Sequence, residues 1–227
     1  MITSILSGNF DPILLLLRIP IVLLSLSLHE CAHGYAAYKM GDPTAKMFGR
    51  ITLNPLKHLD IMGTICMFLF GFGWAKPVPV NARRFNNPKK GMAITAAAGP
   101  ISNVLLAMIA LIVYNVIFKS YSLFAGSEFA ADLWYVILVF FMSLHYMNLS
   151  LAVFNLIPVP PLDGSRLAFI FLPDDAYFKF MKYERVIQII IMVALFTGFL
   201  DKPLTLIVSG LSNGMQYIIN LIIGIFV

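Results

Sequence analysis

Three ionisable side chains, His29, Glu30 and His33, stand close together in an otherwise apolar stretch of the sequence. On an α-helix, His29 and His33 lie one turn apart on the same face, so both can ligate one metal ion. Glu30 is offset by one residue, which leaves its carboxylate near the ion but free to act as a base. Zinc lowers the pKa of a bound water to about 7, and a nearby carboxylate can take its proton during attack on a carbonyl. The spacing therefore predicts a zinc hydrolase.

A catalytic zinc ion needs a third protein ligand and an open coordination position. A third histidine six residues after the second is excluded, because that position is Lys39. A glutamate shortly downstream is also excluded, since the next one is Glu128. Cys31 points about 200° away from His29 around a helix, so we expect it to serve in packing. The remaining candidates for the third ligand are His58, Asp60, His145 and Asp163.

The composition places these residues in a membrane protein. Of the 227 residues, 59% are hydrophobic and 12% are charged, and the mean hydropathy is +0.86. A soluble domain carries about 25% charged residues, so the polar surface that keeps a folded chain in water is missing. A helix that crosses the hydrocarbon core needs about 20 apolar residues. The stretches that meet or approach this length are residues 13–39, 92–118, 134–157, 186–200 and 204–227.

A further apolar stretch, residues 61–74, has only 14 residues and is too short for a comfortable span. Membrane proteins keep Lys and Arg on the cytoplasmic side. Most of the 16 Lys and Arg lie on either side of this stretch or near the third span, in residues 39–57, 76–90 and 166–185. All three segments lie inside if residues 61–74 dip into the membrane and return. We therefore expect an all-α polytopic membrane protein of five transmembrane helices, or six if residues 61–74 cross.

Residues 50–54 and 76–81 have a pattern typical of extended chain. We expect them to form a small membrane-associated β-hairpin with the re-entrant residues 61–74; the alternative is a plain interfacial loop. No repeat divides the chain, so we expect one membrane-embedded domain. This domain occupies residues 1–227, with a core at 12–170 and C-terminal helices at 183–227.

Asp163 is the favoured third ligand. It follows three prolines between positions 158 and 161 that prevent the helix from continuing. Irregular backbone at membrane depth is tolerated only inside a protein or beside a wet cavity. His33 and Asp163 also lie near the same end of their spans. The competing interpretation is an interfacial aspartate that caps the segment after Gly164.

Taken together, these motifs resemble the site-2 protease family of intramembrane zinc metalloproteases. The resemblance covers most of residues 20–170, and the N-x-x-P-x-P-x-x-D-G run from Asn155 to Gly164 makes it far more specific than the histidine pair alone. Residues 41–58 and 73–81 resemble the small bacterial branch that has neither a PDZ nor a CBS domain. Ile61 departs from the pattern, which has proline there, and touches no catalytic role. The matching segments are residues 29–33, 41–46, 50–58, 73–81, 99–103 and 155–164.

The resemblance implies one zinc ion per chain, held by His29, His33 and Asp163. It implies that Glu30 is the catalytic base. It also implies that Asn155 donates a hydrogen bond to the oxyanion of the tetrahedral intermediate, a contribution of about 2.7–4 kcal/mol where such donors have been removed.

Asn103 matches the G-P-x-x-N motif of the helix between the two ligand-bearing helices. Two roles remain open for it. It can make an interhelical hydrogen bond that permits close packing beside Gly99, or it can take part in the chemistry or in substrate binding.

The expected function is a zinc metalloendopeptidase that cleaves transmembrane segments of membrane proteins, as in regulated intramembrane proteolysis. The expected partners are transmembrane-helix substrates and the lipid bilayer, without nucleic acid. The expected location is a bacterial cell membrane, crossed several times, with the active site toward the cytoplasm. One alternative is a divalent-cation transporter, which Glu30 and the single Asp-Gly loop disfavour because they make one closed site. Another is an inactive relative that only binds helices, which the intact ligand set disfavours.

Overall fold

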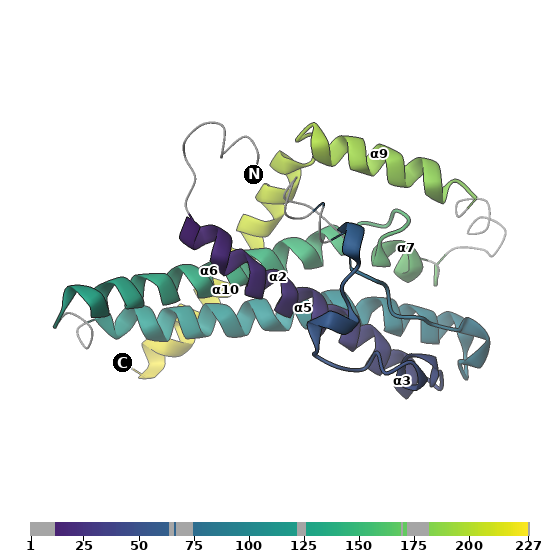
Figure 1. The fold of residues 1–227 in the computed structure, drawn as a ribbon, viewed down its shortest axis with the longest axis horizontal. Coiled ribbons are helices and arrows are strands. Elements are labelled where there is room, and N and C mark those ends of the chain that lie inside the picture. Colours follow the sequence, from purple (N-terminus) through teal and green to yellow (C-terminus); the bar gives the residue numbers. More distant parts are fainter. Residues whose placement is uncertain are drawn as a thin grey trace.

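The structure is a computed structural model that describes residues 12–63, 66, 75–121, 126–168, 170–171 and 182–226 (Figure 1). The long helices are α2 (Pro12–Lys39), α5 (Pro88–Lys119), α6 (Glu128–Asn155) and α10 (Asp201–Phe226). The shorter ones are α3 (Thr44–Met47), η1 (Pro55–Lys57), η2 (Ala82–Arg84), α7 (Asp163–Ala168) and α9 (Glu184–Phe196).

The two central helices begin at residues that cap a helix N-terminus. The Asn87 side chain accepts a hydrogen bond from the backbone N–H of Lys90 at 3.1 Å, and Pro88 occupies the first turn, where its missing N–H is not needed. Ser127 caps α6 in the same way through the N–H of Ala130, at 3.2 Å. Local sequence therefore fixes where both helices start.

Three helices among the described residues are long and apolar enough to cross a membrane: Leu16–Lys39, Pro88–Lys119 and Glu128–Asn155. Each of the five expected long segments overlaps a helix, but only these three described helices meet the length and hydropathy of a span, so the expected five to six spans are not confirmed. The fourth expected span, residues 186–200, overlaps α9, which has 13 residues. At 1.5 Å per residue this helix is about 20 Å long, shorter than the hydrocarbon core of about 30 Å.

Helices α2, α5 and α6 pack against one another, and α10 packs on α6 (Figure 1). One buried cluster takes a residue from each of the first three helices: Ile21, Ala110 and Leu144. A second cluster joins α5 and α6 to α10 through Ala107, Leu149 and Val208. The small alanines let the helix backbones approach closely, as is usual where lipid rather than water surrounds the helices.

The outer face of α5 has the character of a lipid-facing surface. Its exposed apolar residues recur every three or four positions and so form one stripe along the helix. In water such a stripe would be costly, whereas hydrocarbon accommodates it. These residues are Ile101, Leu105, Ile109, Ile112 and Val116.

His145 connects helices and does not join a metal cluster. Its Nδ1 donates to the carbonyl of Ala107 at 2.9 Å, and its Nε2 accepts from the Ser212 hydroxyl at 2.9 Å. The side chain is completely buried, so these bonds satisfy both ring nitrogens. His145 therefore docks α10 against α5 and α6, which removes it from the candidates for the third ligand.

The expected re-entrant residues 61–74 fall largely outside the described residues, which resume at Ala75. The two ends of this stretch are nevertheless joined, because Leu59 and Ala75 form an isolated antiparallel bridge. Next to it, the N–H of Lys76 donates to the carbonyl of His58 at 2.8 Å. No longer strand occurs in the described part of the chain, so the expected β-hairpin is reduced here to one bridge.

The chemistry of residues 76–81 explains why a longer ladder does not form on this segment. Pro77 and Pro79 have no N–H to donate to a sheet. The carbonyls of Lys76 and Pro77 accept hydrogen bonds from the guanidinium of Arg50. Side chains rather than a neighbouring strand therefore hold this extended segment.

Candidate metal centre

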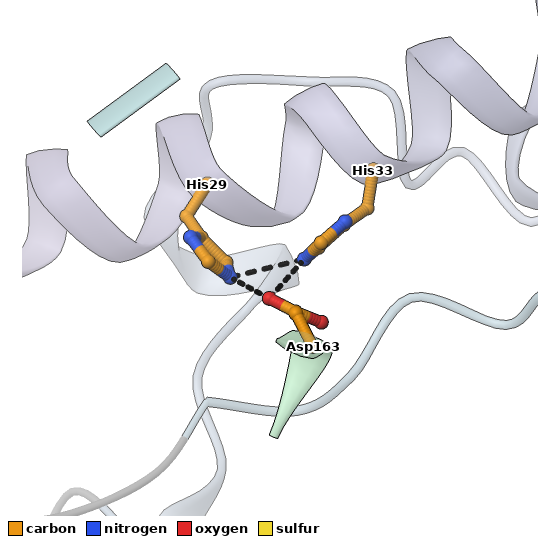
Figure 2. Close-up of side chains that lie close together, drawn as sticks. All are labelled: His29, His33 and Asp163. Carbon is orange, nitrogen blue, oxygen red and sulfur yellow. Dashed lines mark hydrogen bonds and ion pairs between the residues drawn. The ribbon is translucent and has the colours of Figure 1, made fainter. Parts of the chain in front are cut away.

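Figure 2 shows the imidazoles of His29 and His33, one turn apart on α2, facing the carboxylate of Asp163. The two Nε2 atoms are 3.0 Å apart, and each lies 3.2 Å from Asp163 Oδ2. Of the residues that the structure describes, these three make up the one group of His, Cys, Asp or Glu that could hold a metal ion. The structure thus brings the two predicted histidines together with the favoured third candidate.

Hydrogen bonds on the far side of each ring fix how the imidazoles are protonated. His33 Nδ1 donates to the carbonyl of Thr95 at 2.7 Å, and His29 Nδ1 donates to Asn103 Oδ1 at 3.0 Å. Because each partner is an oxygen acceptor, each neutral ring carries its hydrogen on Nδ1 and a lone pair on Nε2. Both lone pairs are then available for a metal ion.

These atoms fit zinc. The Oδ2 atom of Asp163 is buried and has no hydrogen-bond partner among the described residues. Two nitrogen lone pairs and a carboxylate oxygen that meet in this way repel one another unless a cation lies between them. A tetrahedral zinc ion with bonds of about 2.0–2.1 Å separates its ligand atoms by about 3.3 Å, close to the distances found here.

A carboxyl group binds a metal ion in its ionised form, so zinc held between these atoms would keep Asp163 as a carboxylate.

A folded-back loop places Asp163 at the end of α6. Gly164 follows it, and a side chain there would collide with the carbonyl oxygens of Leu156 and Ile157. The Ser165 hydroxyl donates to the carbonyl of Leu162 at 2.7 Å and closes the first turn of α7. The prolines of this loop end α6, and the glycine lets α7 start directly against it.

Helix α5 approaches the histidines at Gly99. A Cβ added there would collide with His33 Nε2 and would lie 2.6 Å from His29 Cε1. Glycine is thus required for the two helices to come this close at the level of the metal site.

We therefore expect Gly99→Ala to weaken zinc binding by about 10–100-fold or more, because the new methyl group displaces both rings. Zinc retained after dialysis against a chelator measures the effect. Gly210→Ala on α10 is the matched control, since an added Cβ there meets no atom within 4 Å. Alanine is the better helix former at both positions, so an equal loss of zinc in both variants would contradict this reading of Gly99.

A cavity of about 190 Å³ adjoins the three residues. Glu30 and Asn155, the predicted base and oxyanion donor, both line it. Glu30 Oε2 accepts a hydrogen bond from the N–H of Val78 at 2.8 Å, which holds the carboxylate in place. Asn155 Nδ2 donates to the carbonyl of Leu151 at 3.0 Å, in the last turns of α6. The arrangement places a candidate metal site, a carboxylate and a carboxamide around one space.

The other candidate ligands have different partners. His58 is buried, and its Nε2 donates to the carbonyl of Thr52 at 2.8 Å. The carboxylate of Asp60 accepts from the N–H of Gly63 at 2.8 Å, as in the first turn of a helix. Both hold local loop structure and lie outside the metal group.

Asp42 is a site residue that sequence reasoning missed. Its Oδ2 accepts from the N–H of Asn81 at 2.6 Å, and its Oδ1 accepts from the hydroxyl and the N–H of Thr44. Burial acts to raise the pKa of this carboxyl, but the hydrogen bonds from Asn81 and Thr44 hold the pKa below its ordinary value. Asp42 thereby ties residues 76–81, one wall of the cavity, to the end of α2.

The model of "Peptidase family M50" matches residues 18–137 and 127–200. The chain belongs to peptidase family M50. This assignment confirms the resemblance to site-2 proteases. The protein is therefore an intramembrane zinc metalloprotease. No finding supports the transporter or the inactive helix-binding protein.

Relatives of this M50 peptidase are named as zinc metalloproteases. YwhC from Bacillus subtilis is 41% identical over 176 residues, which are 78% of each chain. Rip2 from Mycobacterium tuberculosis is 29% identical over 148 residues, 63% of this chain and 52% of Rip2. Rip2 from Mycolicibacterium smegmatis is 28% identical over 147 residues, again 63% and 52%. This M50 chain thus spans about half the length of Rip2, and no solved structure matches it significantly.

Proposed function

We propose that this M50 metalloprotease cleaves transmembrane segments of other membrane proteins, with its zinc ion held by His29, His33 and Asp163. The observation that carries the proposal is the meeting of three electron-pair donor atoms within 3.2 Å, beside a cavity that also contains Glu30. When bound, zinc supplies Lewis acidity toward a peptide carbonyl and toward water.

The remaining steps belong to residues of the chain. Glu30 takes the proton that the attacking water releases at its carboxylate and passes it to the leaving amide nitrogen. The N–H of Val78, 2.8 Å from Oε2, supports this role because it holds the carboxylate at the cavity. Asn155 donates its second amide hydrogen to the developing oxyanion, since within the described residues its Nδ2 donates to the carbonyl of Leu151 alone.

The substrate must unwind, because the carbonyls of a transmembrane helix are hydrogen-bonded and shielded. Pro77, Val78 and Val80 line the cavity in an extended segment, which supports binding of the substrate as an extended strand beside them. The N–H of Val78 is used by Glu30, so pairing with the substrate falls to the backbone around Val80. A substrate held there lies next to the proposed zinc site.

We place the protein in a bacterial cell membrane as a single domain, residues 1–227, with core 12–170 and C-terminal helices 183–227. Five helices cross, and the short α9 crosses by local thinning of the bilayer. The N-terminus lies outside, and residues 61–74 re-enter from the cytoplasmic side. The Leu59–Ala75 bridge supports re-entry because it joins the two ends of that stretch. All three segments rich in Lys and Arg then lie in the cytoplasm, on the side toward which the active site opens.

Accessibility labelling tests this topology. In a chain without Cys31 and Cys66, single cysteines at Lys57 and Lys89 are expected to react with an impermeant reagent from the cytoplasmic face only. A cysteine at Lys119, at the far end of α5, is the control and is expected to react from the opposite face. Labelling of positions 57 and 89 from opposite faces would contradict re-entry.

The function itself is tested by comparing the membrane proteomes of cells that carry the wild-type protein or Glu30→Gln. Intact membrane proteins are expected to accumulate in the variant. In wild-type cells, new termini are expected inside hydrophobic segments. New termini confined to soluble domains would contradict cleavage of transmembrane segments, and zinc uptake into vesicles would favour transport instead.

A further inference from the structure

We propose that Asn103 is a positioning residue for His29 and that it sets how tightly the chain binds zinc. The proposal rests on the zinc site proposed above. Asn103 lies on α5 behind the imidazole of His29, and it is not among the residues that line the catalytic cavity. It therefore acts through His29 and not on the substrate.

The contact between Asn103 and His29 selects the form of the imidazole that can bind a metal ion. Asn103 Oδ1 lies 3.0 Å from His29 Nδ1, and both side chains are buried. An amide oxygen only accepts hydrogen bonds, so Nδ1 carries the ring hydrogen and Nε2 keeps its lone pair. That Nε2 is the atom 3.2 Å from Asp163 Oδ2. Turning the amide around would place its N–H against Nδ1 and move the ring hydrogen to Nε2, where it would block a metal.

The register of the two helices explains why this residue stands at this position. On α5, Thr95, Gly99 and Asn103 are four residues apart and share one face. Thr95 meets His33 and Asn103 meets His29, so α2 and α5 run in opposite directions with Gly99 between the rings. His33 is held by a backbone carbonyl, which no substitution removes. His29 is held by a side chain, so the hydrogen bond from His29 to Asn103 is the one that a substitution can remove.

A role in packing alone does not account for the hydrogen bonds of Asn103. Its Nδ2 is buried and has no hydrogen-bond partner in the described part of the chain. The oxygen accepts from His29 Nδ1 at 3.0 Å, whereas the neighbouring Ser102 hydroxyl donates its one hydrogen to the carbonyl of Gly99 at 2.7 Å. The hydrogen bond with His29 is therefore the one strong side-chain contact of Asn103 among the described residues. An amide that served only to join helices would be expected to satisfy its donor as well.

The test measures zinc affinity, by competition with a chromophoric chelator, in the purified full-length protein. Asn103→Leu is expected to weaken zinc binding about 10–100-fold, as outer-shell substitutions do. Asn103→Asp keeps an oxygen acceptor beside His29 Nδ1 and is expected to bind zinc as tightly as the wild type or more tightly. Asn103→Ala carries the same expectation as the leucine variant and replaces it if that variant does not fold.

Asn148→Leu is the matched control. Asn148 is equally buried, lies on α6 and donates to the Ser25 hydroxyl at 2.9 Å, one turn of α2 before His29 and not to a residue of the metal group. Its variant is expected to lose stability and to keep its zinc affinity. If Asn103→Leu binds zinc as tightly as the wild type, or if Asn148→Leu weakens binding as much, the positioning role is wrong.

The His29→Ala variant distinguishes a failure of the role proposed for Asn103 from a failure of the zinc site on which that role rests. If His29→Ala loses zinc and Asn103→Leu does not, the zinc site stands and only the role of Asn103 falls. If His29→Ala still binds zinc like the wild type, the zinc site is wrong and the role of Asn103 falls with it.

Discussion

Replacing Glu30 with glutamine is expected to lower kcat/KM for peptide cleavage by about 10²–10⁴-fold while one zinc ion stays bound. Glutamine has nearly the same size and keeps an oxygen that can accept the hydrogen bond from Val78, so the cavity wall stays in place. It cannot take a proton from water, and this step is the one that the account assigns to Glu30. Cleavage of a model transmembrane substrate in detergent, together with zinc content, measures both parts of the prediction.

Glu128→Gln is the control for the charge itself. Glu128 lies in the exposed first turn of α6, far along the chain from the cavity residues, and its variant is expected to cleave normally. If Glu30→Gln keeps most of its activity, Glu30 is not the base. If the variant loses zinc together with activity, Glu30 belongs to the metal site instead.

Replacing Asp163 with alanine is expected to abolish zinc binding and cleavage together. The loss should exceed the 10–100-fold that removal of an outer-shell partner costs, because a ligand atom itself disappears. Two imidazoles then remain, fewer than the three protein ligands of a catalytic zinc site. Zinc content by elemental analysis and the same cleavage assay measure the outcome.

Asp60→Ala provides the comparison, because Asp60 was an alternative third ligand. Its carboxylate accepts from the N–H of Gly63. We expect this variant to bind one zinc ion like the wild type. A normal zinc content in Asp163→Ala, or a loss of zinc in Asp60→Ala, would show that Asp163 is not the third ligand.

The chemistry of the site could be predicted from sequence because it depends on short-range geometry. The four-residue spacing of His29 and His33 defines one face of a helix whatever surrounds it. The prolines before Asp163 end α6 by local rules, and the membrane composition makes a buried carboxylate conspicuous. These features need no knowledge of how helices pack.

The supporting contacts depend on packing and were therefore not predictable. That Asn103 meets His29 follows only once α2 and α5 are placed in register. The tie between Asp42 and Asn81 joins residues 39 positions apart. The role of His145 became clear only from its partners on α5 and α10. A linear sequence shows that these polar residues are unusual but not which residues they meet.

The extended segments show a limit of pattern reading. Alternation of residues 76–81 predicted a small sheet, but the described residues form one bridge, between Leu59 and Ala75. Pro77 and Pro79 remove donors, and Arg50 takes the carbonyls. Periodicity indicates an extended backbone, whereas the partner of that backbone is decided by the side chains around it.

Zinc K-edge X-ray absorption of the purified protein tests the central claim most directly. We expect one zinc ion with nitrogen and oxygen neighbours at about 2.0–2.2 Å, two of them imidazoles, and no sulfur. The spectrum of Asn103→Asp should keep the same ligands, since that residue only supports His29. A sulfur neighbour at about 2.3 Å, which would bring in Cys31 or Cys66, or a third imidazole, would contradict the assignment of His29, His33 and Asp163.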